Sequence, residues 1–286
     1  MKKIIIVLII IALGWGLYYL SQNKSDTVKA PDTTLDADKD TNTASSTTDV
    51  ALDTNKEQTV LGKSVEGRDI VAYHFGAGEK ELLFVGGIHG AYSYNTALVA
   101  EELVKDIKSG SLVVPDGLKV TVVPLLNPDG YEKAKGSAEG RFNANTVDLN
   151  RNFDCDWQTK GVWQSKSVSG GTNAFSEPES QAIKTYIEGS KPAGVVVWYS
   201  SAGGVFSSSC HNGVLPETSA MTKEFSKASG YPAHESFNYY EITGDMVNWL
   251  AKEKIPAISV LLTNHTDAEW NKNKLGIEAL LKYFSK

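Results

Sequence analysis

The feature that most constrains this chain is a short apolar run that ends in two glycines and a histidine, within residues 82–93. The run at 82–85 reads Leu-Leu-Phe-Val, which is too short for a helix and predicts a buried β-strand. Gly86 and Gly87 allow the backbone to turn tightly or to pass close to another group. The pattern therefore places His89 just past the C-terminal end of a strand, where open α/β sheets bind their ligands.

The N-terminal residues predict a targeting segment and a linker before the folded part. Residues 1–20 hold two lysines followed by an uncharged apolar run, and about 20 such residues cross a bilayer. We expect an uncleaved signal anchor, with a cleaved signal peptide as the alternative. Residues 21–58 are rich in Thr, Asp and Ser and predict a disordered linker. The domain at 59–286 is then extracytoplasmic, anchored to the cytoplasmic membrane, or secreted if the segment is cleaved.

Within residues 59–286, apolar runs that predict strands alternate with amphipathic segments that predict helices. We expect strands at 71–75, 82–85, 120–126, 195–199 and 258–262, and helices at 94–107, 178–187, 243–252 and 275–284. Ser176 is expected to cap the second of these helices, and Glu179 to complete a capping box. This order predicts one α/β domain with a mixed, mainly parallel central sheet and helices on both faces.

Charge and cysteine content limit the function classes further. The formal net charge is -6, and no basic patch interleaved with aromatic residues occurs in the sequence, which argues against nucleic acid as a partner. Cys155 and Cys210 are the two cysteines, and both lie in expected loops. An extracytoplasmic location permits a disulfide between them, and two buried free thiols are the alternative.

Six motifs carry a family resemblance. They lie at 62–68, 86–90, 127–130, 147–153, 176–179 and 256–260, and read GKSVEGR, GGIHG, NPDG, VDLNRNF, SEPE and PAISV. In this order and spacing they resemble the M14 family of zinc carboxypeptidases, over nearly all of residues 60–286. The resemblance implies a mixed sheet flanked by helices. It also implies removal of C-terminal residues from peptides, or trimming of peptidoglycan stem peptides, by a zinc held by His, Glu and His with a second Glu as general base.

Position by position, the resemblance retains one metal ligand and loses the other catalytic residues. His89 matches the first zinc ligand. The second should be a glutamate three or four residues later, where the chain has Tyr92 and Ser93, and we assign the position to Ser93. Tyr199 stands at the third ligand position and Leu261 at that of the general base. Because a catalytic zinc needs three protein ligands, and hydrolysis needs a base, the sequence predicts no cofactor and no hydrolysis.

The residues that would hold a substrate are retained. Asn150 and Arg151 match the pair that binds the substrate's C-terminal carboxylate, a group that the arginine fork suits. Arg141 matches the arginine that polarises the scissile carbonyl. Tyr240, four residues before Gly244, matches the family's mobile tyrosine.

Three functions follow from these residues. The first is a membrane-anchored, extracytoplasmic pseudoenzyme, monomeric, that binds peptide or peptidoglycan-stem C-termini without hydrolysis. The second is an active, zinc-dependent metallocarboxypeptidase that removes C-terminal residues from peptides. The third is a structural domain without a ligand. Retention of Arg151 beside Ser93, Tyr199 and Leu261 favours the first.

Overall fold

The computed structural model describes residues 56–211 and 213–286. The predicted membrane segment at 1–20 lies outside these residues, as does the predicted linker up to residue 55. Among the helices of the described residues, none is both long and apolar enough to span a bilayer. The first strand, β1 (Gln58–Lys63), begins one residue before the domain boundary expected at 59.

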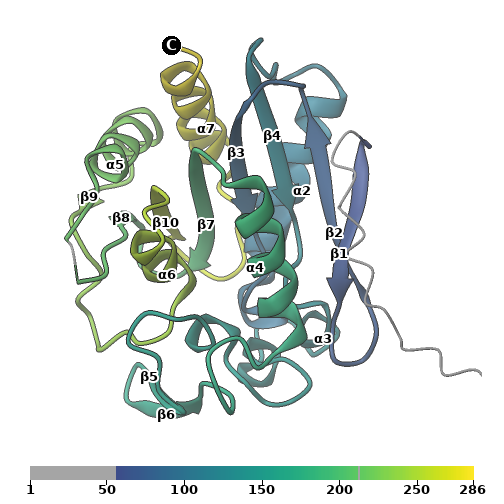
Figure 1. Cartoon of the computed structure of the whole chain (residues 1–286), viewed down its shortest axis with the longest axis vertical. Helices are drawn as coiled ribbons and strands as arrows, with labels where there is room; N and C mark the ends of the chain where they lie inside the picture. Colours follow the sequence, from purple (N-terminus) through teal and green to yellow (C-terminus); the bar gives the residue numbers. More distant parts are fainter. Residues whose placement is uncertain (1–55, 212) are drawn as a thin grey trace, which may run out of the picture. The chain divides into compact units, whose positions relative to one another are not determined.

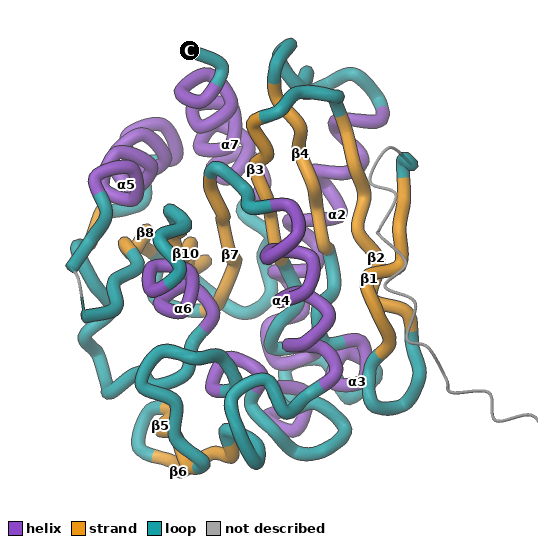
Figure 2. Tube along the Cα trace, viewed as in Figure 1, coloured by secondary structure: helices purple, strands orange, loops and turns teal. Residues whose placement is uncertain are grey.

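An eight-stranded mixed sheet forms the centre of the described domain, in the order β1-β2-β4-β3-β7-β10-β8-β9 (Figures 1 and 2). The four strands β4, β3, β7 and β10 are parallel to one another, and antiparallel pairs follow on both sides. The predicted mixed sheet is confirmed, with its parallel part at the centre. The bounds are β2 (Asp69–Phe75), β3 (Lys80–Val85), β4 (Leu118–Val123), β7 (Gly194–Ser200), β8 (Gly204–Ser207), β9 (Ala233–His234) and β10 (Ala257–Leu262).

Helices cover both faces of the sheet, as predicted, and bury a separate apolar core on each. One core includes residues of α4 (Pro178–Ser190) and α6 (Met246–Lys252), which lie in front of the sheet in Figure 1. The other includes residues of α2 (Tyr94–Lys108), α5 (Pro216–Ser229) and α7 (Trp270–Phe284). Shorter elements are η1 (Gly90–Ser93), α3 (Pro128–Tyr131), η2 (Ala138–Arg141), η3 (Leu149–Arg151) and the hairpin of β5 (Lys160–Trp163) and β6 (Lys166–Ser169).

Some local predictions are wrong. The cap of α4 is Glu177 without a side-chain cap bond, because the Ser176 hydroxyl donates to Glu177 and Glu179 accepts from the Val65 N–H. The helix expected at 243–252 begins only at Met246, since Gly244 is hydrogen-bonded through both backbone groups to the segment 153–155. The last helix begins earlier than expected, at residue 270, and α5 was not predicted.

The parallel strands bring distant residues to one edge of the sheet. Because β3, β7 and β10 are adjacent and parallel, their carboxyl ends meet, and Leu261 of β10 lies beside Tyr199 of β7 in register. After β3 the chain turns at Gly87, whose φ is 64° and whose missing Cβ would lie 2.6 Å from the Leu125 side chain. Only glycine fits this turn, and it directs His89 to the same edge.

The disulfide predicted between Cys155 and Cys210 is present. It joins the loop after η3 to the loop after β8, across 55 residues of sequence. Both sulfur-bearing side chains are buried and pack with Ala251 of α6. The alternative of two free thiols is therefore wrong for this structure.

Candidate functional site

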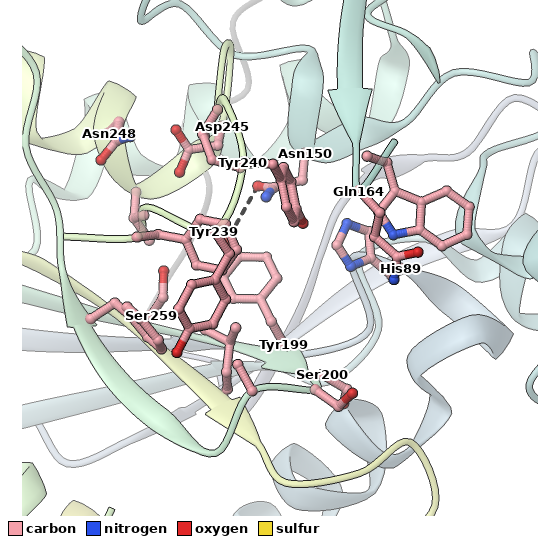
Figure 3. Close-up of a pocket in the computed structure, with 18 of the residues that line it drawn as sticks. His89, Asn150, Gln164, Tyr199, Ser200, Tyr239, Tyr240, Asp245, Asn248 and Ser259 are labelled. Carbon is pink, nitrogen blue, oxygen red and sulfur yellow. Dashed lines mark hydrogen bonds between the residues drawn. The ribbon is translucent and has the colours of Figure 1, made fainter. Parts of the chain in front are cut away.

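A cavity of about 420 Å³ opens at the carboxyl ends of the central strands (Figure 3). Seven of the residues expected at the site line it, and they come from the ends of β7 and β10, from η2 and η3, and from the loops after β3 and β9: His89, Arg141, Asn150, Arg151, Tyr199, Tyr240 and Leu261. The fold therefore assembles residues that are separated by up to most of the domain's length.

Three buried side chains form a hydrogen-bonded group at one side of the cavity. Nε of Arg141 donates to Oδ2 of Asp148 at 2.8 Å. Nε2 of His89 lies 3.4 Å from Oδ1 of the same carboxylate, and Nδ1 lies 3.3 Å from Nη1 of Arg141. This arrangement assigns the proton of the neutral imidazole to Nε2, facing Asp148, and directs the lone pair of Nδ1 at the guanidinium.

The charges of this group follow from burial. Burial, aided by the positive charge of Arg141, lowers the pKa of His89 to about 4, so the imidazole is neutral near pH 7. Burial by itself would raise the pKa of Asp148, but the positive charge of Arg141 and the nearby His89 imidazole, whose Nε2 has no closer polar partner among the described residues, hold it below its usual range. The group is therefore an arginine–aspartate ion pair beside a neutral histidine.

Ser93, which we expected at the second ligand position, does not line the cavity. Its side chain is fully buried, and its Oγ has no hydrogen-bond partner within the part of the chain that the structure describes. Tyr92 lines the cavity instead, because residues 90–93 form the 3₁₀ turn η1 and side chains three apart lie on one face of such a turn. The tyrosine three residues after His89 therefore takes the place that we assigned to Ser93.

The other two catalytic positions carry a phenol and a hydrocarbon. The hydroxyl of Tyr199 donates to Oδ1 of Asn150 at 3.0 Å, and its ring centroid lies 5.6 Å from that of His89. Burial, together with the charge of Asp245, raises the pKa of Tyr199 well above its ordinary value, so the phenol keeps its proton. Leu261 offers no donor or acceptor at all.

These side chains do not fit the zinc centre that the resemblance implies. The lone pair of His89 faces a cation, Tyr199 uses its hydroxyl as a donor, and burial raises the pKa of Tyr92 as well. A protonated phenol is a poor ligand, and a catalytic zinc needs three good ones with an open position for water. The three ligand positions and the general-base position therefore provide one imidazole and no carboxylate.

The carboxylate-binding residues are arranged differently. Arg151 is almost fully buried, and its guanidinium is fixed from one side, with Nε and Nη2 donating to the Val162 carbonyl at 3.0 and 2.6 Å. Nη1 donates to the Asn150 carbonyl at 2.6 Å. These contacts occupy three of the five N–H groups of an arginine, so Nη1 and Nη2 each keep one for a ligand.

Asn150 and Tyr240 complete this side of the cavity. Oδ1 of Asn150 accepts hydrogen bonds from the Tyr199 hydroxyl and, at 3.1 Å, from the Met246 N–H. The side chain is thus anchored through its oxygen, which leaves its amide nitrogen as a donor for a ligand (Figure 3). The ring of Tyr240 lies 6.0 Å from the Arg151 guanidinium.

Asp245 is a site residue that sequence reasoning missed. It lines the cavity, only 5% of its surface is exposed, and Oδ1 has no hydrogen-bond partner among the described residues. Burial raises its pKa to about 6, against the opposing charge of Arg151. In Figure 3 Asp245 and Asn248 are on the opposite side of the cavity from His89. The signal available in the sequence was its place directly after Gly244, at the start of a helix.

Trp163 was missed as well, because nothing in its local sequence marks it. It lies on the β5–β6 hairpin, and its ring is 4.6 Å from the Arg141 guanidinium and 5.0 Å from the ring of Tyr92. His265 also lines the cavity, with its ring 4.5 Å from that of Tyr92. Aromatic rings thus shield Arg141 from solvent and form one wall of the site.

Comparison with known proteins agrees with this fold. Residues 53–262 match the zinc carboxypeptidase family model, Peptidase_M14. The chain therefore belongs to the zinc carboxypeptidase family.

Two relatives illustrate the range of the family. The catalytic chain of human carboxypeptidase N is 29% identical over 185 residues, which cover 58% of this chain and 39% of that protein. Bacteriocin BCN5 of Clostridium perfringens is 30% identical over 175 residues, which cover 58% of this chain and 19% of the bacteriocin. This chain thus spans well under half the length of these relatives.

Solved structures share the fold. Murein-tripeptide amidase MpaA from Escherichia coli O157 superimposes with a TM-score of 0.60 at 22% identity, covering 79% of this chain and 92% of the amidase. Bovine thrombin-activatable fibrinolysis inhibitor, solved in complex with tick carboxypeptidase inhibitor, superimposes with a TM-score of 0.63 at 18% identity, covering 80% and 88%. At these identities the likeness establishes the fold alone.

Proposed function

We propose that this protein binds the free C-terminus of a peptide or a peptidoglycan stem peptide without hydrolysing it. The observation that carries the proposal is a cavity with Arg151, Asn150 and Tyr240 on its wall and with Tyr199 and Leu261 in place of catalytic residues. The fold shared with a murein-tripeptide amidase and with an inhibitor-bound carboxypeptidase supports a peptide as ligand.

The contacts of the bound terminus follow from the remaining donors. The carboxylate would accept the free N–H groups on Nη1 and Nη2 of Arg151 and a further one from the Asn150 amide, which suits its two oxygens. Tyr240 lies beside this guanidinium and would cover the bound group. Arg141 is paired with Asp148 and lines the same cavity, where a remaining N–H group would donate to the next carbonyl of the peptide.

Hydrolysis lacks a proton acceptor at the position where the family has its general base. A water beside the peptide bond needs a general base, and Leu261 has none to offer. The lone pair of His89 faces Arg141, and the carboxylate of Asp148 is held in its ion pair. His89 and Asp148, the two proton-accepting groups next to the assigned catalytic positions, are therefore already engaged with Arg141, and Asp245 lies on the opposite side of the cavity from His89.

Isothermal titration of the protein with a short peptide and with its C-terminally amidated form tests the proposal. Hydrogen bonds to a charged group contribute about 1.5–3 kcal/mol, so amidation should weaken binding about tenfold to a hundredfold. Tyr240→Ala, which removes the ring beside Arg151, should weaken binding of the free acid. Equal affinity for acid and amide would refute the proposed contact, and no binding to any peptide would favour the structural domain.

The alternative function is an active zinc carboxypeptidase, and family membership supports it. Metal analysis of protein purified without chelators, combined with an assay for released C-terminal residues, separates the two. We expect no release of terminal residues. Release that depends on stoichiometric zinc and stops with a chelator would establish the alternative and overturn our proposal.

A restoration experiment tests the assignment of the site positions. Tyr92→Glu and Tyr199→His together would supply, with His89, the three ligand types of a zinc peptidase. We expect this double variant to gain zinc binding. The matched control, Ser93→Glu with Tyr199→His, should not, because Ser93 does not line the cavity. Zinc uptake by the control but not by the first variant would reverse the assignment.

We propose further that residues 1–20 anchor a monomeric protein with its domain outside the cytoplasm. The apolar segment supports an anchor, and the disulfide supports an oxidising compartment. Fractionation of cells and protease treatment of intact spheroplasts should find the domain in the membrane fraction and accessible from outside. A soluble, protease-protected domain would contradict this location, and sedimentation of detergent-solubilised protein checks the monomer.

A further inference from the structure

Four potential metal ligands lie together at the disulfide, away from the histidine of the main cavity. They are two pairs of sequence neighbours, Cys155 with Asp156 and Cys210 with His211, and their ligand atoms all lie within 4.8 Å of one another. Oδ2 of Asp156 is 3.8 Å from Sγ of Cys155, and Oδ1 is 3.1 Å from Nε2 of His211.

We propose that these four residues form a redox-gated site for Zn²⁺ or a similar divalent cation. The sulfurs cannot ligate a metal while they are bonded to each other, because the ligand is the thiolate. Once a thiol or phosphine reductant opens the bond, the chain presents two thiols, an imidazole and a carboxylate. Two sulfurs with a nitrogen and an oxygen are a ligand set that tetrahedral zinc accepts.

The geometry requires only small movements. Tetrahedral zinc with bonds of about 2.0–2.3 Å separates its ligand atoms by about 3.3–3.8 Å. The two sulfurs must separate after reduction, and the other ligand atoms, which already lie within 4.8 Å, need to approach by about 1 Å. The φ angles of Asp156 and His211 are 51° and 50°, in the left-handed region. In an extended strand, neighbouring side chains point to opposite faces, but this backbone conformation lets each residue lie on the same side as the cysteine before it.

The site also has a buried side and an open one. Cys155 and Cys210 are 5% and 3% exposed, which shields the thiolates. The side chains of His211 and Asp156 are 65% and 57% exposed, so a cation can enter from solvent. The contact between them is a weak obstacle, because exposed polar contacts contribute little to stability and a cation can replace this one.

Reduction of the disulfide and binding of the metal require only a phosphine, one water and Zn²⁺. A phosphine and one water convert the disulfide to two thiols and a phosphine oxide, in which the phosphorus is oxidised and the two sulfurs are reduced. Zn²⁺ then replaces the two thiol protons and releases about two protons near pH 7, since free thiols have pKa values near 8.5. The bond and the metal are therefore alternative cross-links between the same two loops.

The cross-link lies behind one wall of the main cavity. The carbonyl of Cys155 accepts a hydrogen bond from Gly244, which precedes the cavity residue Asp245. Ser209, next to Cys210, lines the cavity and donates its N–H to Asn248 at 2.9 Å. A metal that joins the two loops would hold this wall in place when the disulfide is open.

Cobalt titration of the full-length protein, with and without a phosphine reductant, tests the site, because tetrahedral Co²⁺ thiolates absorb strongly in the visible region. We expect one Co²⁺ per reduced chain with a thiolate charge-transfer band, its displacement by Zn²⁺, and no band for the oxidised protein. His211→Ala and Asp156→Asn leave the disulfide intact, and each should weaken binding to the reduced chain at least tenfold.

The paired variant Cys155→Ser, Cys210→Ser should lose the band, and this separates the site from any cation at His89. Failure of the reduced protein to give the band would overturn the proposal. Affinity unchanged by both His211→Ala and Asp156→Asn would overturn it too, because the thiols alone would then account for the binding.

Discussion

The buried carboxyl of Asp245 should make the stability of this protein depend on pH in a way that Asp245→Asn removes. The native pKa is about 6, against an ordinary value of 3.8, because burial disfavours the charged form. The native state thus binds this proton more tightly than the unfolded chain does. The resulting stabilisation is complete below pH 3.8 and is lost as the pH rises through about 6.

The size of this effect follows from the two pKa values. A tenfold change in proton affinity corresponds to about 1.4 kcal/mol, so the rise from 3.8 to about 6 corresponds to about 3 kcal/mol. The opposing charge of Arg151 is already contained in the native pKa of about 6, and any change in packing in the variant adds an offset that does not vary with pH. Part of this change has already occurred at pH 4, so the stability difference between variant and wild type should shift by about 2.5 kcal/mol in favour of the variant between pH 4 and pH 7.5.

Urea denaturation at several pH values, followed by tryptophan fluorescence, measures this difference directly. Other titrating groups are shared by both proteins and cancel in the comparison. Asp116→Asn changes an exposed carboxylate and serves as the matched control, for which we expect no such trend. A difference for Asp245→Asn that stays constant over this pH range would refute the reasoning, because it would mean that Asp245 is ionised alike in the folded and unfolded states.

Three further outcomes are expected. His89→Gln should reduce the loss of unfolding free energy at acid pH. The native pKa of His89 is about 4 against an ordinary 6.5, so the wild type loses about 3 kcal/mol as the pH falls through this range. The same acid dependence in urea titrations of both proteins would contradict this expectation. Replacing both cysteines by serine should lower the free energy of unfolding by about 4 kcal/mol, from the entropy of a loop of 55 residues; equal denaturation midpoints for the variant and the oxidised protein would exclude this. Tyr199→Phe should cost about 1 kcal/mol, because Asn150 loses one donor and keeps the Met246 N–H; a loss of several kcal/mol would point to a larger role for the phenol.

Local sequence rules predicted the parts of this protein that depend on neighbours in the chain. The apolar run of β3 and the glycines after it predicted a strand and a turn that deliver His89, and the structure has both. The alternation of strands and helices predicted the mixed sheet with helices on both faces. The predicted capping box at Ser176 is absent because the Ser176 hydroxyl is hydrogen-bonded to the side chains of Glu177 and Asn152 and does not cap the helix. The contact with Asn152 forms only when the chain is folded, so local sequence could not predict it.

The sequence alone determined the family and predicted the disulfide pair and seven of the cavity residues, because motif order and strand ends are properties of the chain itself. Only the tertiary structure decided that Tyr92 and not Ser93 faces the cavity, since this depends on the 3₁₀ turn of η1. It also decided that the lone pair of His89 faces Arg141 and that Asp245 is buried without a partner at Oδ1. The physical reason is that hydrogen-bond partners and burial, which set protonation and ligand capacity, come from segments that meet only when the chain is folded.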